Sequence, residues 1–246
     1  MIHFQTHTDS TNRIAREMVA AGAPAGTVVV AGSQSAGRGQ YGRAFNSPPG
    51  GLYFSSIVEP PLPVIKIPLV TLATGVACRR VLHDSFDIQP MLKWPNDLFL
   101  STKKVAGILC ESISRQHRDP ARVKVIVGVG LNVNSTIEQF DPEIRPLVTT
   151  LQEELGYSVD LKNLLHQILS AIDKSVKDLS VNHRTVLDEW QRYDMLLHKP
   201  VKYLTDNEQI KGVGHGLTPE GYYRICDYAG QEHTVIGGQL RLVSPQ

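Results

Sequence analysis

The amino-acid sequence predicts an α+β fold, in which antiparallel strands and helices are followed by a small all-β unit. Two observations carry this expectation. Between Met91 and Val129, three strand-like runs are joined by connections short enough for antiparallel pairing. After Pro200, short strands alternate with turn clusters at a spacing typical of a small β-barrel. We therefore expect two domains, residues 1–198 and residues 199–246.

Helices are predicted where apolar residues recur at helical spacing. The first follows a cap at Asp9 or Ser10 and ends before Gly22. A second is predicted over 67–82, with a basic pair near its end. Two or three more fill 143–197, where leucines and isoleucines form one apolar stripe.

Strands are predicted from short β-branched or apolar runs. They are 27–31, 52–58, 91–94, 105–110 and 123–129, and then 201–204, 209–214, 222–227, 232–236 and 240–243. Between the first two, residues 35–51 contain five glycines and two prolines, which excludes a helix or a central strand. Because long loops in compact domains are usually functional, this segment is a candidate site.

The composition excludes several classes of protein. Apolar residues make up 41% and charged residues 20%, as in soluble globular proteins, and a net charge of +1 gives no general attraction to nucleic acid or membranes. No apolar run approaches a membrane span, and the N-terminal segment lacks a signal-peptide core. Three scattered cysteines fit a reducing compartment. We therefore expect a cytoplasmic protein.

The long loop carries the heptad GRGQYGR at residues 37–43. Its glycines let backbone amides approach a ligand closely, and Arg38 and Arg43 can bind carboxylate or phosphate. A solvated turn would be the simpler interpretation of such a heptad by itself. An irregular stretch between two buried strands forgoes packing, however, and this favours a binding function.

Two further segments place charged side chains at strand ends. In KWPND (residues 93–97), proline ends the strand and Asp97 follows Asn96 at its mouth, where the carboxylate could hold Mg²⁺ directly or through water. Lys104 enters an apolar strand and could stabilise charge on a carboxylate that attacks a phosphate. Taken alone, KWPND is best interpreted as a plain turn. Lys103 and Lys104 taken alone would be two solvated lysines in a hairpin turn, and we keep that interpretation for Lys103.

The segment GVGLNVN at residues 128–134 lacks the third glycine and the following helix of a dinucleotide-binding fingerprint. Its glycines more readily leave room for a flat ligand over the sheet, with Asn132 offering an amide. A GxxxxGK[ST] loop and a GxSxG elbow are both missing, and the nine histidines have no zinc-like spacing. The sequence therefore excludes a P-loop enzyme.

Five motifs follow one another along the chain: Asp9–Asn12, GRGQYGR with Ser47–Gly50, KWPNDL, Lys104–Leu109 and GVGLNVN. In this order they resemble the biotin protein ligases up to about Asn134, and the C-terminal β segment resembles that family's small SH3-like domain. Each motif alone is weak, but five in register are specific. The resemblance implies a mixed, largely antiparallel sheet flanked by helices, as in class II synthetases, with a small C-terminal SH3-like β-barrel.

The resemblance also implies a reaction. Such an enzyme uses ATP and Mg²⁺ to convert biotin to biotinyl-5′-adenylate, and transfers biotin to a lysine of a biotin carboxyl carrier protein. Carried over by position, catalysis would rest on Lys104, Arg38 and Asp97. The implied biotin-binding residues are Ser10, Thr11, Asn12 and Gln34 at the ureido end, Arg38, Gly39 and Gln40 in a closing loop, Lys104 at the carboxylate, and Gly107, Gly128 and Gly130 for clearance. Those implied for ATP are Arg43, Asn96, Asp97 and Asn132, with Asp97 near Mg²⁺.

Two positions depart from the family's commonest pattern. Gln40 stands where a second arginine is usual, which keeps hydrogen bonding but loses a charge and could loosen the grip on the adenylate. Phe45 stands where tryptophan is common, which preserves an aromatic lid and loses the indole donor.

Other functions stay open at this point. A lipoate or octanoate ligase or transferase of the related fold would prefer a longer apolar tunnel than the polar Ser10–Asn12 set suggests. A DNA-binding repressor is not expected, because the motifs begin at Asp9 and Lys199–Gln246 has no basic cluster interleaved with aromatics. The presence of Lys104, Arg38 and Asp97 together argues against a binding module without activity. An exposed sheet edge would allow a homodimer, and the sequence leaves the oligomeric state open.

Overall fold

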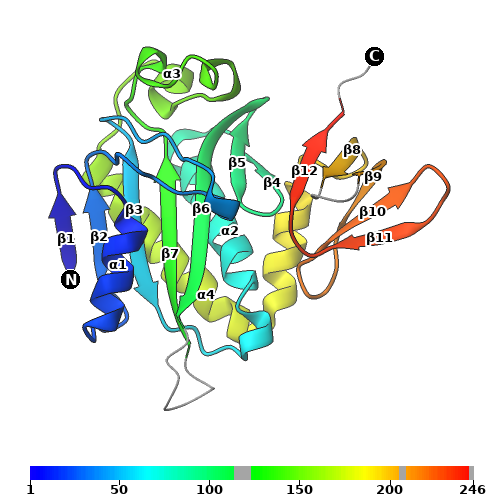
Figure 1. Cartoon of the computed structure of the whole chain (residues 1–246), viewed down its shortest axis with the longest axis horizontal. Helices are drawn as coiled ribbons and strands as arrows, with labels where there is room; N and C mark the ends of the chain where they lie inside the picture. Colours follow the sequence, from blue (N-terminus) through cyan, green and yellow to red (C-terminus); the bar gives the residue numbers. More distant parts are fainter. Residues whose placement is uncertain (114–122, 205–208, 244–246) are drawn as a thin grey trace.

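The protein is described from a computed structural model that covers residues 1–113, 123–204 and 209–243 (Figure 1). A seven-stranded sheet has the order β1-β2-β3-β7-β6-β5-β4. The strands are β1 (Ile2–Gln5), β2 (Val28–Ala31), β3 (Leu52–Val58), β4 (Met91–Lys93), β5 (Asp97–Leu100), β6 (Lys103–Ile113) and β7 (Lys124–Leu131). β1 and β2 run parallel and every other pair is antiparallel, which confirms the mixed, largely antiparallel sheet.

Helices cover both faces of this sheet. Helix α1 (Thr11–Ala20) lies in front of it in Figure 1, and α2 (Leu69–Phe86) and α4 (Leu161–Arg192) lie behind it. Because strand side chains alternate between faces, Val29 packs with α1 whereas its neighbours Val28 and Val30 pack with the α2–α4 layer. The predicted helices are confirmed, with a short α3 (Leu151–Leu155) preceding α4.

The C-terminal strands form a second, antiparallel sheet in the order β11-β10-β9-β8-β12. They are β8 (Pro200–Leu204), β9 (Gln209–Leu217), β10 (Tyr223–Asp227), β11 (Glu232–Val235) and β12 (Gln239–Leu242). Over the ranges that the structure covers, no pairing joins β11 to β12. The five strands that the sequence predicts are thus present, while closure into a barrel is not seen.

The two sheets share one apolar core. Val201, Tyr223 and Leu240 of the C-terminal sheet belong to the same buried cluster as α2 and α4. Trp94, at the end of β4, donates its indole N–H to the carbonyl of Gly221 over 3.1 Å. The C-terminal sheet is therefore fixed directly against the segment that carries KWPND.

Sequence patterns did not indicate two strands. β1 is a short edge strand, and β5 begins at Asp97, inside a segment that reads as a turn. Across the described ranges, none of the helices is both long and apolar enough to cross a bilayer.

Candidate active site

A cavity of about 880 Å³ lies on the face of the large sheet that α1 partly covers. Ile126 packs under α1, and Gly128 and Gly130 continue the same face of β7 beyond the helix. Every site residue predicted from the sequence lines this cavity: Ser10, Thr11, Asn12, Gln34, Arg38, Gly39, Gln40, Arg43, Asn96, Asp97, Lys104, Gly107, Gly128, Gly130 and Asn132. The fold thus brings together five motifs that are far apart in the chain.

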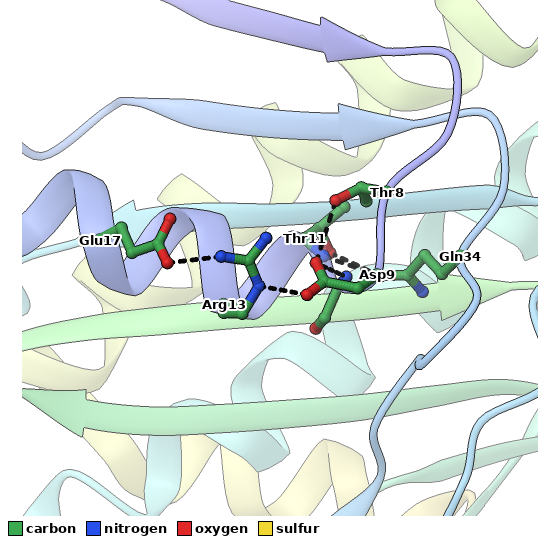
Figure 2. A network of polar contacts seen from close by, with 7 residues as sticks. Thr8, Asp9, Thr11, Arg13, Glu17 and Gln34 are labelled. Carbon is green, nitrogen blue, oxygen red and sulfur yellow. Dashed lines mark hydrogen bonds and ion pairs between the residues drawn. The ribbon is translucent and has the colours of Figure 1, made fainter.

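A polar network fixes the first motif at the start of α1 (Figure 2). Gln34 Oε1 accepts hydrogen bonds from the Thr11 backbone N–H (2.9 Å) and hydroxyl (3.2 Å). The Asp9 carboxylate accepts from Thr8 Oγ1 and binds Arg13, which also pairs with Glu17. Arg13 lowers the pKa of Asp9 to about 2, mainly through their hydrogen bond. The network holds the helix start in one orientation against the loop.

Gly107, Gly128 and Gly130 form the bottom of the cavity, called here the glycine floor, and the Asn12 side chain lies against it at Gly128. Its Nδ2 donates to Glu111 Oε2 (2.8 Å), and its Oδ1 lies 2.6 Å from Ser55 Oγ. A Cβ at Gly128 would lie only 2.1 Å from Asn12 Oδ1. Glycine is therefore required at 128 because the Asn12 amide approaches the backbone closely.

Phe45 covers the neighbouring part of the floor. A Cβ at Gly130 would lie 2.4 Å from Phe45 Cε1, and one at Gly107 would lie 3.1 Å from Phe45 Cε2. The Lys104 ammonium lies 5.6 Å from the centre of the same ring. The glycines thus make room for an aromatic side chain of the loop, which lies over the sheet beside Lys104.

Lys104 and Asp97 form the charged centre of the cavity. Lys104 Nζ lies 2.6 Å from Asp97 Oδ1, and both side chains remain partly exposed to the cavity. β5 and β6 pair antiparallel with a bulge between Leu98 and Phe99, and this register carries the two residues to one place. The pair is positioned by strands, so its geometry is rigid.

Further positive charge gathers around this pair. The pKa of Lys93 is lowered, first because burial removes its ammonium from water and then because Lys104, Arg241 and Arg43 repel another charge, while Asp97 opposes the shift. Such a concentration of cations favours an anionic ligand.

Asparagine side chains connect the cavity wall to the backbone. Asn96 Nδ2 donates to the carbonyl of Ile108 over 2.6 Å, and Asn132 Nδ2 donates to that of Thr149 over 3.0 Å. Asn132 Oδ1 is buried and has no hydrogen-bond partner within the described residues. That oxygen is therefore an acceptor whose hydrogen-bonding capacity is unused among the described residues of the cavity wall.

Comparison with known proteins identifies the family. Residues 4–132 match the model of the biotin/lipoate A/B protein ligase family. The chain belongs to this family.

Individual relatives agree with this assignment. The bifunctional ligase/repressor BirA of Bacillus spizizenii is 32% identical over 89% of this chain, which spans 67% of that protein's length. The biotin--[acetyl-CoA-carboxylase] ligase of Paracoccus denitrificans is 27% identical over 92% of this chain and 94% of its own. The structure of Aquifex aeolicus biotin protein ligase in complex with biotin and ATP superposes with a TM-score of 0.84 at 30% identity, covering 98% of this chain and 99% of that one.

Residues that the sequence did not indicate support the cavity of this biotin/lipoate ligase family member. Ser55 and Glu111, on the same face of the sheet, hydrogen-bond with the Asn12 side chain of the cavity wall, and neither stands in a recognisable motif. The strip Gly238–Leu242 forms a wall of the cavity and lies outside the segment that the family model matches. Only the packing of the second sheet on the first reveals that wall.

Proposed function

We propose that this chain is an ATP-dependent biotin protein ligase that works in two half-reactions. In the first, a carboxylate oxygen of biotin attacks the α-phosphorus of ATP, and the broken P–O bond releases pyrophosphate. In the second, the ε-amino group of a lysine on a biotin carboxyl carrier protein attacks the acyl carbon of the adenylate. An amide bond forms, AMP leaves with the electron pair of the C–O bond, and the amine loses a proton.

One observation carries the proposal: a single cavity joins a polar, hydrogen-bonding end to a cluster of cations. Biotin has a polar ureido ring at one end and a carboxylate at the other, so the two ends of the cavity complement the two ends of the molecule. Family membership and relatives named as biotin ligases support the same choice.

At the polar end, Ser10, Thr11, Asn12 and Gln34 bind the ureido group. Thr11 hydrogen-bonds with Gln34, Gln34 with Ser47, and Asn12 with Glu111 and Ser55, and these bonds hold the side chains at fixed positions before the ligand arrives. A site that is preorganised in this way loses less entropy on binding.

At the charged end, Lys104 contacts the biotin carboxylate and the α-phosphate. Two anions must approach each other for the first half-reaction, and a fixed ammonium lowers their repulsion most where charge develops in the transition state. In the structure Lys104 Nζ is paired with Asp97 Oδ1 at 2.6 Å. Binding of the anionic reactants offers this ammonium stronger partners.

The nucleotide lies against Arg43, Asn96, Asp97 and Asn132. The buried, unpartnered Asn132 Oδ1 is suited to accept a hydrogen bond from an amino group such as that of adenine. Arg43 belongs to the cationic group that lowers the pKa of Lys93, and it supplies charge for the phosphates.

Magnesium would be held by Asp97 together with the phosphates of ATP. Within the described part of the chain, no group of three or more His, Cys, Asp or Glu side chains could hold a metal ion. Mg²⁺ commonly takes one or two protein carboxylates and completes its shell with substrate phosphates and water, so Asp97 alone can serve as its protein ligand. When bound, the ion would offset phosphate charge.

The loop over the cavity shields the mixed anhydride from water. Arg38, Gly39 and Gln40 line the cavity from the loop, and Phe45 of the same loop covers the glycine floor. Exclusion of water protects a reactive acyl phosphate and strengthens the electrostatic interactions around it.

The remaining parts of the proposal concern the protein's surroundings. A carrier protein is the acceptor, and the enzyme works in the cytoplasm, as its three free cysteines suggest. DNA and membranes are not partners. A homodimer would use the edge strand β1, whose Ile2 and Phe4 are exposed.

The proposal is tested by incubating the full chain with ATP, Mg²⁺, labelled biotin and a carrier domain. Covalent label is expected on the carrier's lysine and not on a carrier in which arginine replaces that lysine. Biotin-dependent exchange of pyrophosphate into ATP measures the first half-reaction alone. Activity with lipoate or octanoate in place of biotin would assign the chain to the other branch of its family, and label with none of them would reject the ligase function.

A further inference from the structure

A contact between the two sheets involves a residue that the site has not yet explained. The backbone N–H of Gly238 donates a hydrogen bond to Tyr41 Oη over 2.6 Å. Tyr41 stands in the middle of the GRGQYGR loop, whereas Gly238 follows β11 and directly precedes β12. The contact spans 197 positions of sequence and joins the loop to the C-terminal sheet.

Tyr41 makes this contact from a strained backbone conformation, which costs conformational energy. Tyr41 has φ of 57°, in the left-handed region that residues with bulky side chains rarely adopt. Its side chain is 65% exposed, so burial does not hold the residue in this conformation. Among the described residues, the hydrogen bond to Gly238 and the Arg43 guanidinium, 5.9 Å from the ring centre, are contacts that can offset this cost.

The C-terminal sheet leaves room for the hydroxyl. A Cβ at Gly237 would lie 2.6 Å from Tyr41 Oη, and the next nearest atom, Tyr41 Cζ, would lie 3.8 Å away. A glycine at this position therefore accommodates one atom, the phenolic oxygen.

The contact lies where two walls of the cavity meet. Gly39 N–H donates to Arg43 O over 2.8 Å, which closes a tight turn with Tyr41 at its tip. Gly39 and Gln40 line the cavity on one side of the tip, and Gly238 and its successors in β12 line it on the other. A contact that holds Tyr41 therefore holds the GRGQYGR loop at a fixed position relative to the Gly238–Leu242 wall of the cavity.

We propose that Tyr41 is a positioning residue whose hydroxyl latches the GRGQYGR loop onto the Gly237–Gly238 turn and thereby slows escape of the activated intermediate. The consequence for the intermediate rests on the proposed ligase function, whereas the latch itself is a property of the loop. The Tyr41 hydroxyl would restrain the loop through a hydrogen bond. The neighbouring Gln40 has no charge with which to hold the adenylate, so this restraint would matter more in this chain.

The first test compares Tyr41→Phe with wild type and with Tyr228→Phe, a control in which an exposed tyrosine of the C-terminal sheet loses its hydroxyl outside the cavity. Loss of one hydrogen bond should raise the release rate of preformed biotinyl-adenylate about two- to ten-fold. Biotin-dependent pyrophosphate exchange at saturating substrates should change by a smaller factor, and Tyr228→Phe should match wild type in both. Equal release from Tyr41→Phe and wild type would overturn the latch.

A double-mutant cycle tests the contact from its other side. Gly237→Ala should displace the Tyr41 hydroxyl and raise adenylate release in the wild-type background. In the Tyr41→Phe background the same methyl group meets only Cζ at an ordinary distance, so it should have little further effect. Fully additive effects of the two substitutions would show that Gly237 and Tyr41 do not act through this contact, and would reject the proposal.

A readout without ligands separates the latch from the ligase function. Arg38 and Arg43 make the loop a substrate for trypsin, and cleavage there should be about two- to ten-fold faster in Tyr41→Phe than in wild type or Tyr228→Phe. Equal cleavage rates would refute the latch whatever the activity. If wild type catalyses no biotin-dependent exchange while Tyr41→Phe is still cleaved faster, the ligase function fails and the latch stands.

Discussion

The substitution Lys104→Met tests the charged centre of the cavity directly. Methionine keeps a long, unbranched side chain that can cover the glycine floor at Gly107, and it removes only the ammonium group. The same substitution at Lys103 provides a matched control, because Lys103 is the preceding residue of β6 and is exposed. Both variants lose one positive charge, so net charge cannot explain a difference between them.

The expected magnitudes follow from the geometry. Removing one preorganised group that stabilises developing charge typically slows catalysis about 10²- to 10³-fold, equivalent to roughly 3–4 kcal/mol. The Lys104 and Asp97 side chains are 29% and 22% exposed, so the loss of their ion pair should cost only about 1 kcal/mol of the free energy of unfolding. Activity should therefore fall far more than stability.

Biotin-dependent pyrophosphate exchange measures the chemical step, and thermal unfolding measures stability. Lys104→Met should lose exchange by the factor above, while Lys103→Met should stay within about two-fold of wild type. Exchange by Lys104→Met within about three-fold of wild type would refute the reasoning, because a side chain that contacts both reactants cannot be removed at so small a cost.

Three further predictions concern the floor, the core and the loop. Gly128→Ala puts a Cβ 2.1 Å from Asn12 Oδ1, and the forced shift should weaken biotin binding by about ten-fold or more in calorimetry; unchanged affinity would show that Asn12 is not part of the biotin site. Burial raises the pKa of Asp194 to about 6 from 3.8, so the native state holds its proton more tightly than the unfolded chain. Stability of the wild type relative to Asp194→Asn should therefore fall by roughly 3 kcal/mol as pH rises from about 4 to above 6, and a parallel pH dependence of the two in denaturant titrations would contradict this. Gln40→Arg restores a charge beside the adenylate and should slow its release several-fold, measured as retention on the isolated enzyme; unchanged or faster release would exclude the role given to this position.

The sequence predicts those parts of the fold in which local pattern and tertiary environment agree. The main helices and the buried strands have a clear apolar pattern in the sequence, and the structure confirms them. β1 and β5 were missed for different reasons. β1 is an edge strand whose Ile2 and Phe4 remain exposed, and β5 begins at Asp97, in a segment whose residues are typical of turns.

The same distinction explains the candidate site. Each predicted residue except Gln34 belongs to a motif that is recognisable within a few positions of sequence, so it could be identified before its neighbours in space were known. Gln34 was assigned only by its place in the family resemblance. Ser55 and Glu111 reach Asn12 only because β3 and β6 flank β7 in the sheet, and that register is not written in either strand alone. The roles of the predicted residues stay predictions, although all of them line one cavity.

The C-terminal sheet contributes to this cavity through contacts that span the whole chain. Trp94 of KWPND donates to Gly221 O over 3.1 Å, and its ring lies 6.0 Å from that of Tyr223. Tyr223 in turn donates to Asp194 Oδ2 over 2.6 Å. β4 therefore ends against β10 and the turn that precedes it, and Asp97 lies three residues beyond Trp94. The C-terminal sheet thus packs directly against the segment that leads to Asp97, through a buried aromatic pair and the hydrogen bond from Trp94 to Gly221, so it supports the charged centre of the cavity as well as lining one of its walls.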